Sequence, residues 1–225
     1  MNFVSKYTVV FLCIVLSGCA GMIRSVDQEQ VESIRKVAVV SQLGNTFIGS
    51  LTATTVFGNK GYKVDASGWQ VDRAITAAAV EAIQRGGRSA LSLQSNAKLP
   101  ELLKEATNNG ADTLFLVTPA GYSNQPDFPP GYGFHRRVFL GIDRACIYSL
   151  FVTVAYDVKS GREIGQSWSF PKSEGAIPCE ATAGIAWKDD FARYTKDERE
   201  LIRKATIASV TTNIQTSVTG LGLTR

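Results

Sequence analysis

Residues that build most catalytic and metal centres are scarce in this 225-residue chain. It contains one histidine, His135, and four cysteines. A structural zinc site usually needs four nitrogen or sulfur ligands at close spacings, and a serine hydrolase needs a histidine base that a carboxylate orients. The G-x-S-x-G segment that presents a nucleophilic serine does not occur either. We therefore expect no metal site, no cofactor and no catalytic residues.

The sequence also lacks a strong excess of either charge. Twenty-four basic residues stand against twenty acidic ones, and the basic residues are scattered along the chain. Nucleic-acid-binding proteins gather Lys and Arg in a patch or stripe, so nucleic acid is not an expected partner. Hydrophobic residues make up 44 % of the sequence, which is enough for a buried core and argues against disorder. The length suits one domain, or one domain with a long insertion.

The apolar run at 7–16 is too short to span a membrane, which takes about 20 residues. It follows Lys6, the one charged residue in 1–18, and it runs into Leu16-Ser17-Gly18-Cys19. A basic start, a short apolar core and small residues before a cleavage point are typical of a secretory signal. We therefore interpret residues 1–18 as a signal peptide.

The four residues that end this segment resemble the lipobox of bacterial lipoproteins. The resemblance implies that the signal is cut before Cys19, that Cys19 receives a diacylglyceryl group, and that its new amine is acylated, for example with palmitate. An ordinary secreted protein with a stray cysteine is the alternative. Ala20 stands where Asp would imply retention in the inner membrane. We therefore expect an anchor in the outer membrane, with the protein facing the periplasm.

The remainder divides into a short polar segment and one folded domain. We interpret residues 19–35 as the lipidated cysteine and a tether, and residues 36–225 as a periplasmic domain. Apolar and β-branched runs predict strands at 36–43, 50–57, 62–67, 89–95, 112–118, 138–142, 146–158 and 162–170. Glycine stops, an initial proline and a capping-box sequence predict helices at 71–85, at 100–110 and from Thr195 toward Val218.

This order of elements predicts an α/β fold, in which helices pack on a mixed β-sheet to form an α/β sandwich. The strands around 58–61 and around 159–161 are expected to form hairpins, because short turns rich in Gly, Asn and Ser separate them. In the last helix, apolar residues recur at helical spacing and predict one face that packs on a core or a partner. These residues are Ile207, Val210, Ile214 and Val218.

A second resemblance covers roughly residues 36–218. The segments "ADTLFLV" at 111–117 and "VTVAYDVKSGREIGQS" at 152–167 are similar to a strand-and-hairpin pattern of periplasmic lipoproteins and related domains. These include the N-terminal domain of the translocation protein TolB, the curli-secretion lipoprotein and the lipoprotein activators of penicillin-binding proteins. Their members are mostly assembly or interaction modules. The resemblance therefore implies a non-catalytic module that docks on an envelope protein or associates with itself.

Two other functions stay open at this point. An envelope hydrolase acting on cell-wall or lipid material would need His135 in a pocket beside a nucleophile and an acid. A small-molecule binder would need a cavity that Trp69, Trp168 and Trp187 could line together. The alternative for the three tryptophans is ordinary packing in the core or at its edge.

Two cysteines remain after the signal peptide and the lipid are accounted for. Cys146 and Cys179 would lie in an oxidising compartment, where disulfides form and persist. The hairpin that turns at 159–161 brings the returning chain close to Cys146 shortly before it reaches Cys179. We expect a disulfide between them, contributing roughly 3–4 kcal/mol, with two unpaired buried thiols as the alternative.

The segment 119–137 holds four of the seven prolines and shows no periodicity, which predicts a loop. Long loops are usually functional or disordered, and aromatic residues beside arginines are typical of binding hot spots. The candidate partner-binding residues are Tyr122, Phe128, Tyr132, Phe134, His135, Arg136 and Arg137. The alternative is a surface loop whose rings pack against the sheet.

The lipobox resemblance predicts that Cys19→Ser abolishes membrane anchoring. Mass spectrometry of the wild-type protein extracted from membranes should find an N-terminal Cys19 that carries acyl chains. An unmodified mature protein free in the periplasm would contradict the assignment.

Overall fold

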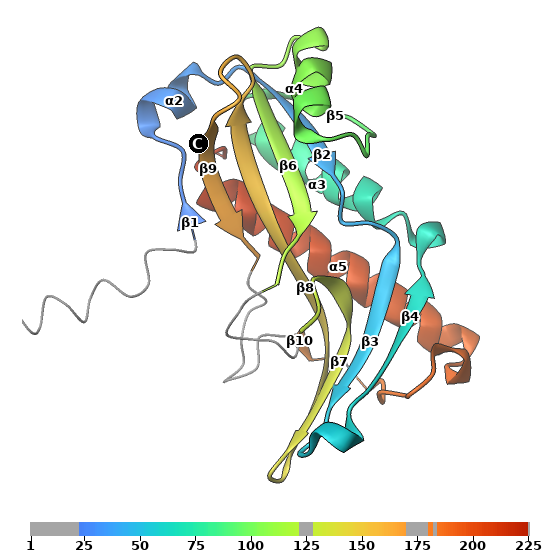
Figure 1. Ribbon diagram of the computed structural model, residues 1–225. Helices are drawn as coiled ribbons and strands as arrows, with labels where there is room; N and C mark the ends of the chain where they lie inside the picture. Colours follow the sequence, from blue (N-terminus) through green and yellow to red (C-terminus); the bar gives the residue numbers. More distant parts are fainter. Residues whose placement is uncertain (1–22, 122–127, 170–179, 182–183, 225) are drawn as a thin grey trace, which may run out of the picture.

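The computed structural model describes residues 23–121, 128–169, 180–181 and 184–224 (Figure 1). Its strands are β1 (Ile23–Arg24), β2 (Lys36–Ser41), β3 (Thr46–Thr52), β4 (Lys60–Asp65), β5 (Ser89–Ser92), β6 (Thr113–Pro119), β7 (Gly131–Phe139), β8 (Ile142–Asp157), β9 (Glu163–Trp168) and β10 (Glu180–Ala181). Its helices are α2 (Gln28–Ser33), α3 (Val71–Arg85), α4 (Leu99–Asn108) and α5 (Lys196–Gly220), with short 3-10 turns η1 (Val56–Gly58), η2 (Ser67–Trp69) and η3 (Phe191–Arg193). The predicted α/β fold, a mixed sheet with packed helices in one domain, is confirmed.

Strand β8 belongs to two half-sheets at once. Along one edge, its residues 142–150 pair with β7 and its residues 151–157 pair with β6. Along the other edge, it pairs with β10 and then with β9. Strand β8 therefore changes its neighbours near its middle. It joins β4-β3-β7 to β6-β2-β5 in the sheet order β4-β3-β7-β8-β6-β2-β5. All four neighbours are antiparallel to β8, whereas β2 runs parallel to β5 and β6.

Helices cover both faces of the sheet around β2. Val37 and Val39 join the core that α3 and α5 complete, whereas Ala38 and Val40 pack with α4 on the other face. Successive side chains of a strand point to opposite faces, which explains why this run is apolar throughout. No helix among the described residues is both long enough and apolar enough to cross a bilayer.

Several local predictions are confirmed. Helix α3 has the predicted bounds, and β3–β4 and β8–β9 are antiparallel pairs. The capping box at the start of α5 is complete: Thr195 Oγ1 accepts the Glu198 N–H, and the Glu198 carboxylate accepts the Thr195 N–H. Val210, Ile214 and Val218 are buried in the core, while Ile207 is only partly buried at its edge.

The predicted tether is wrong from Ile23 onward, because this part of the chain is folded onto the domain. Ile23 pairs with Ser167 in the β1–β9 ladder, and the side chains of Val26 and Ile34 are buried. Only residues 20–22 separate Cys19 from the first strand. A lipid on Cys19 would therefore hold the domain on a very short link.

The predicted loop at 119–137 is also wrong at both ends. Pro119 is the last residue of β6, and β7 begins at Gly131. The strand predicted at 138–142 is instead interrupted by the tight β7–β8 turn, in which Leu140 and Gly141 have positive φ angles of 45° and 84°. The chain therefore reverses direction where the apolar run had suggested a continuous strand.

Gly133 is required by the close approach of three strands. A Cβ at this position would lie 1.9 Å from the carbonyl oxygen of Ile48 on β3 and 2.8 Å from the hydroxyl of Tyr148 on β8. We expect Gly133→Ala to lower the free energy of unfolding by about 3 kcal/mol, because the strands must separate to admit the methyl group. Gly68→Ala is the control, since a Cβ there meets nothing within 4 Å. Equal denaturation midpoints for the two variants would contradict this packing.

Candidate functional site

The residues predicted to bind a partner are mainly core residues. Tyr132, Phe134 and His135 are fully buried in β7, and Phe128 is buried beside them. The prediction that these four side chains face a partner is therefore wrong, and the alternative, that they pack on the sheet, is correct. The remaining aromatic candidate, Tyr122, lies outside the described residues.

Alternation along β7 sends these side chains to opposite faces. Tyr132 and Phe134 belong to the main core with α5, where Tyr132 donates its hydroxyl hydrogen to the Gly44 carbonyl at 3.0 Å. Burial raises the pKa of Tyr132, so its phenol stays protonated. The Phe134 ring packs 6.3 Å from Tyr194, centre to centre. The aromatic character of the segment therefore serves the core.

His135 lies on the other face of β7, beneath the Phe128 ring. The two ring centres are 4.3 Å apart, and His135 Nδ1 is 2.9 Å from the hydroxyl oxygen of Ser50 on β3. A serine therefore stands beside the only histidine of the chain. The histidine is completely buried, so a substrate could not reach it without a rearrangement of the side chains that surround it.

Cys146 is buried on the same face as His135, its neighbour in the β7–β8 ladder. It belongs to a disulfide. The other three cysteines lie outside the described residues, so Cys179 as the partner stays a prediction. Ala181, two positions after Cys179, pairs with Cys146 in the β8–β10 ladder, which supports that prediction.

The two predicted arginines lie near the exposed end of β7. Arg136 donates two hydrogen bonds to the Asp143 carboxylate, from Nε at 2.9 Å and from a terminal nitrogen at 2.7 Å. The Arg137 guanidinium lies 5.7 Å from the centre of the Phe139 ring. Both side chains are half-buried, so they alone of the described candidate set keep access to solvent.

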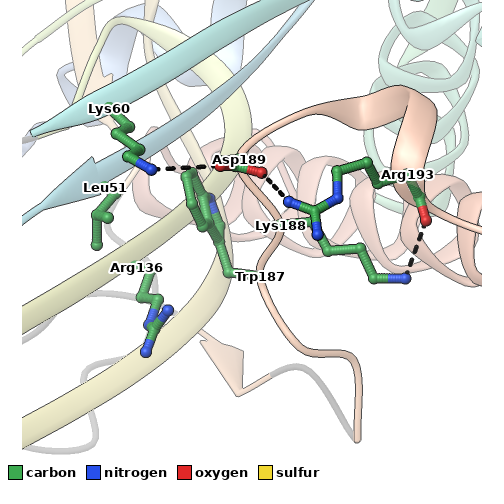
Figure 2. A pocket seen from close by; sticks show the side chains of 7 residues that line it. All are labelled: Leu51, Lys60, Arg136, Trp187, Lys188, Asp189 and Arg193. Carbon is green, nitrogen blue, oxygen red and sulfur yellow. Dashed lines mark hydrogen bonds and ion pairs between the residues drawn. The ribbon is translucent and has the colours of Figure 1, made fainter.

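Arg136 also borders a hollow of about 350 Å³ that is rich in charge (Figure 2). We call it the charged hollow. Its lining comes from β3, β4, β7 and the segment leading into α5. The lining residues are Leu51, Lys60, Arg136, Trp187, Lys188, Asp189 and Arg193. Four of the seven side chains are cationic and one is anionic, and none is a serine, threonine or cysteine.

Asp189 joins two of these cations across the hollow. Its carboxylate accepts from Arg193 at 2.6 Å and from Lys60 Nζ at 3.3 Å, the two contacts that Figure 2 marks at this residue. Hydrogen bonding to Arg193, and then to Lys60, holds the pKa of Asp189 below its ordinary value. The carboxylate therefore remains charged well into the acidic range.

Trp187 fixes the segment that carries Lys188 and Asp189. Its indole N–H donates to the Phe134 carbonyl at 3.2 Å, and the ring itself is buried. Lys188 Nζ donates to both oxygens of Glu198, at 2.7 and 2.9 Å, which ties the segment to the first turn of α5. This contact is the first cause of the lowered pKa of Glu198.

Sequence reasoning missed the charged hollow because its residues come from four separate segments. The acidic pair Asp189-Asp190 gives only a local signal, and Asp190 indeed caps η3 by accepting the Ala192 N–H. In the described part of the chain, no group of three or more His, Cys, Asp and Glu side chains is arranged to hold a metal ion. The charged hollow offers ion pairing and hydrogen bonding to an anionic group.

Comparisons with known proteins add little to this description. No protein-family profile matches the chain, and no curated protein matches it. Among solved structures, it is similar to a variant PelC dodecamer from Paraburkholderia phytofirmans, with 11 % identity, 83 % of this chain and 88 % of that chain covered, and a TM-score of 0.36. A second PelC dodecamer structure from the same organism gives 12 % identity, 83 % and 86 % coverage, and a TM-score of 0.33. Scores at this level carry no inference about function or assembly.

The burial of Phe134 yields a direct test. Phe134→Ala should lower the free energy of unfolding by about 3–5 kcal/mol, because it removes a fully buried ring. The matched control is Phe57→Ala, which truncates a ring that is 96 % exposed and should change stability by less than about 0.5 kcal/mol. Chemical denaturation of the two variants measures the difference. A Phe134→Ala variant as stable as the control would restore the interpretation that Phe134 faces a partner.

Proposed function

We propose that this protein is a lipid-anchored, non-catalytic interaction module of the bacterial envelope. Cys19 would hold it in the outer membrane, and the domain would face the periplasm. The observation that carries the proposal is the charged hollow, in which Lys60, Arg136, Lys188 and Arg193 surround one carboxylate, Asp189. Arginine is enriched among the residues that dominate protein–protein affinity. The partner would present acidic side chains.

Exchange of ion pairs is the physical basis of this docking. Lys60 and Arg193 are held by the protein's own Asp189, and Arg136 by Asp143. Exposed ion pairs contribute little to stability, typically about 0–1 kcal/mol each. A partner carboxylate could therefore take over a cation at small cost, and the positive charge would mainly speed and orient the encounter.

The short link to Cys19 restricts where such a partner can be. The distance from the Cα atom of Cys19 to that of Ile23 is at most about 14 Å in a fully extended chain. The domain would therefore stay against the membrane surface. Its partner would be another membrane-associated protein, or a part of one that lies close to the bilayer.

An envelope hydrolase is the second candidate, and the contact between Ser50 and His135 is the observation that favours it. The complete burial of His135 argues against it. The small-molecule binder gains no comparable support. Trp187 lines the charged hollow, Trp69 lines a different hollow and Trp168 lies on β9.

Charge reversal in the hollow tests the proposed function. Lys60→Glu/Arg193→Glu should reduce the recovery of the envelope partner at least tenfold in chemical crosslinking of intact cells. The reason is that the hollow would then repel acidic groups. Lys98→Glu/Lys104→Glu makes the same change in net charge at exposed positions on and beside α4. This control should crosslink like the wild type. Equal recovery for both variants, at equal abundance and melting temperature, would contradict docking at the hollow.

A further inference from the structure

Exposed apolar side chains gather at the ends of two neighbouring hairpins. Val56 and Phe57, in the turn between β3 and β4, are 76 % and 96 % exposed, while Phe139 and Leu140, at the β7–β8 turn, are 40 % and 77 % exposed. Thr54 Oγ1 donates to the Val138 carbonyl at 3.2 Å, which joins the two turns. Figure 1 shows both turns at the lower end of the sheet. We call this surface the apolar tip.

The apolar tip is unusual within this molecule. Six large hydrophobic residues are exposed in the described part of the chain, and four of them form the tip. The fifth is Ile23, at the point where the chain arrives from Cys19, and the sixth is Leu201 on α5. Exposed apolar surface is therefore concentrated at the tip and beside the anchor.

A belt of basic residues lies directly behind the tip. Arg137 and Arg144 face each other in the β7–β8 ladder, and Lys60 and Arg136 are close to the same end of the sheet. Segments 53–60 and 136–144 together contain four basic residues and one acidic residue, Asp143, which gives a formal charge of +3. Apolar side chains ahead of a cationic belt match a membrane interface. There, rings enter the boundary between headgroups and acyl chains, and cations meet lipid phosphates.

The direction of the chain at the anchor places the tip within reach of the same bilayer. Strand β1 runs antiparallel to β9, and β9 runs antiparallel to β8. The chain therefore enters β1 from the side of the sheet on which the tip lies. Ile23 pairs with Ser167 of β9, and Ser167 pairs with Thr153 of β8. Thr153 is eleven residues after the first residue of β8, so Ile23 lies about 36 Å from the start of β8, measured along the strand.

We propose that the apolar tip inserts into the headgroup region of the anionic phospholipid bilayer that holds Cys19, as a second point of membrane contact. This inference rests on the proposed lipid anchor. The alternative to membrane insertion is that the apolar tips of two copies pack against each other. It would bring two cationic belts together, and like charges in close juxtaposition oppose association. The charge therefore favours an anionic membrane.

Hydrogen exchange of the lipidated mature protein in vesicles tests the proposal. The vesicles contain 30 % phosphatidylglycerol in phosphatidylcholine, and flotation first establishes that the protein is anchored. The amides of 53–59 and 138–144 should exchange at least fivefold more slowly in the wild type than in Phe57→Ser/Leu140→Ser. Leu201→Ser, which removes the exposed leucine away from the tip, should behave like the wild type. Vesicles of phosphatidylcholine alone should weaken the protection.

The possible results of this experiment distinguish insertion of the apolar tip from anchoring by the lipid on Cys19. Anchored protein whose tip amides exchange at the same rate in the wild type and the double variant would overturn tip insertion and leave the lipid anchor intact. Protein that does not float with vesicles would overturn the anchor and the tip proposal together. Protection of the tip amides that appears without vesicles and grows with protein concentration would show that a second copy of the protein, and not the membrane, covers the tip.

Discussion

The backbone hydrogen bonding of β8 is the constraint on which the rest of the structure depends. Its tip-side half is paired with β7 and β10, and its other half with β6 and β9. No other strand joins the two half-sheets, within the residues that the structure describes. Helix α5 packs against β8 and closes the core over both halves. Any bend or break in β8 would therefore change the position of everything that its tip-side half carries.

Both proposed surfaces lie on that half. The charged hollow lies between β3, β4, β7 and the segment leading into α5, and the apolar tip is formed by the turns at the ends of these three strands. The segment that follows Cys19 joins the other half through β1 and β9. A continuous β8 would therefore fix the distance between the lipid anchor and the two surfaces. Because the link to Cys19 is short, the partner and the lipid would be met at one membrane surface.

The sequence predicts those parts of the fold whose signals are local. The alanine-rich run of α3, the Thr195 capping box and the turns of two hairpins each depend on a few adjacent residues. Strand β7 was missed because Gly131 and Gly133 interrupt its apolar alternation, and only the packing of Ile48 and Tyr148 reveals why glycine is needed there. The packing of Val26 and Ile34 was missed because they are isolated in a polar segment. The charged hollow depends on tertiary structure, since its cations come together only when four segments meet.

The rigidity of β8 would fix the lipid anchor relative to the charged hollow and the apolar tip, and native-state hydrogen exchange measures it most directly. The hydrogen-bonded amides of 146–150 and of 152–156 should exchange with the same free energy of opening, equal to that of global unfolding, because one cooperative unit contains both. A free energy of opening lower by about 2 kcal/mol or more in 146–150 would mean that the tip-side half-sheet opens by itself. That result would contradict a fixed geometry between the anchor, the charged hollow and the apolar tip.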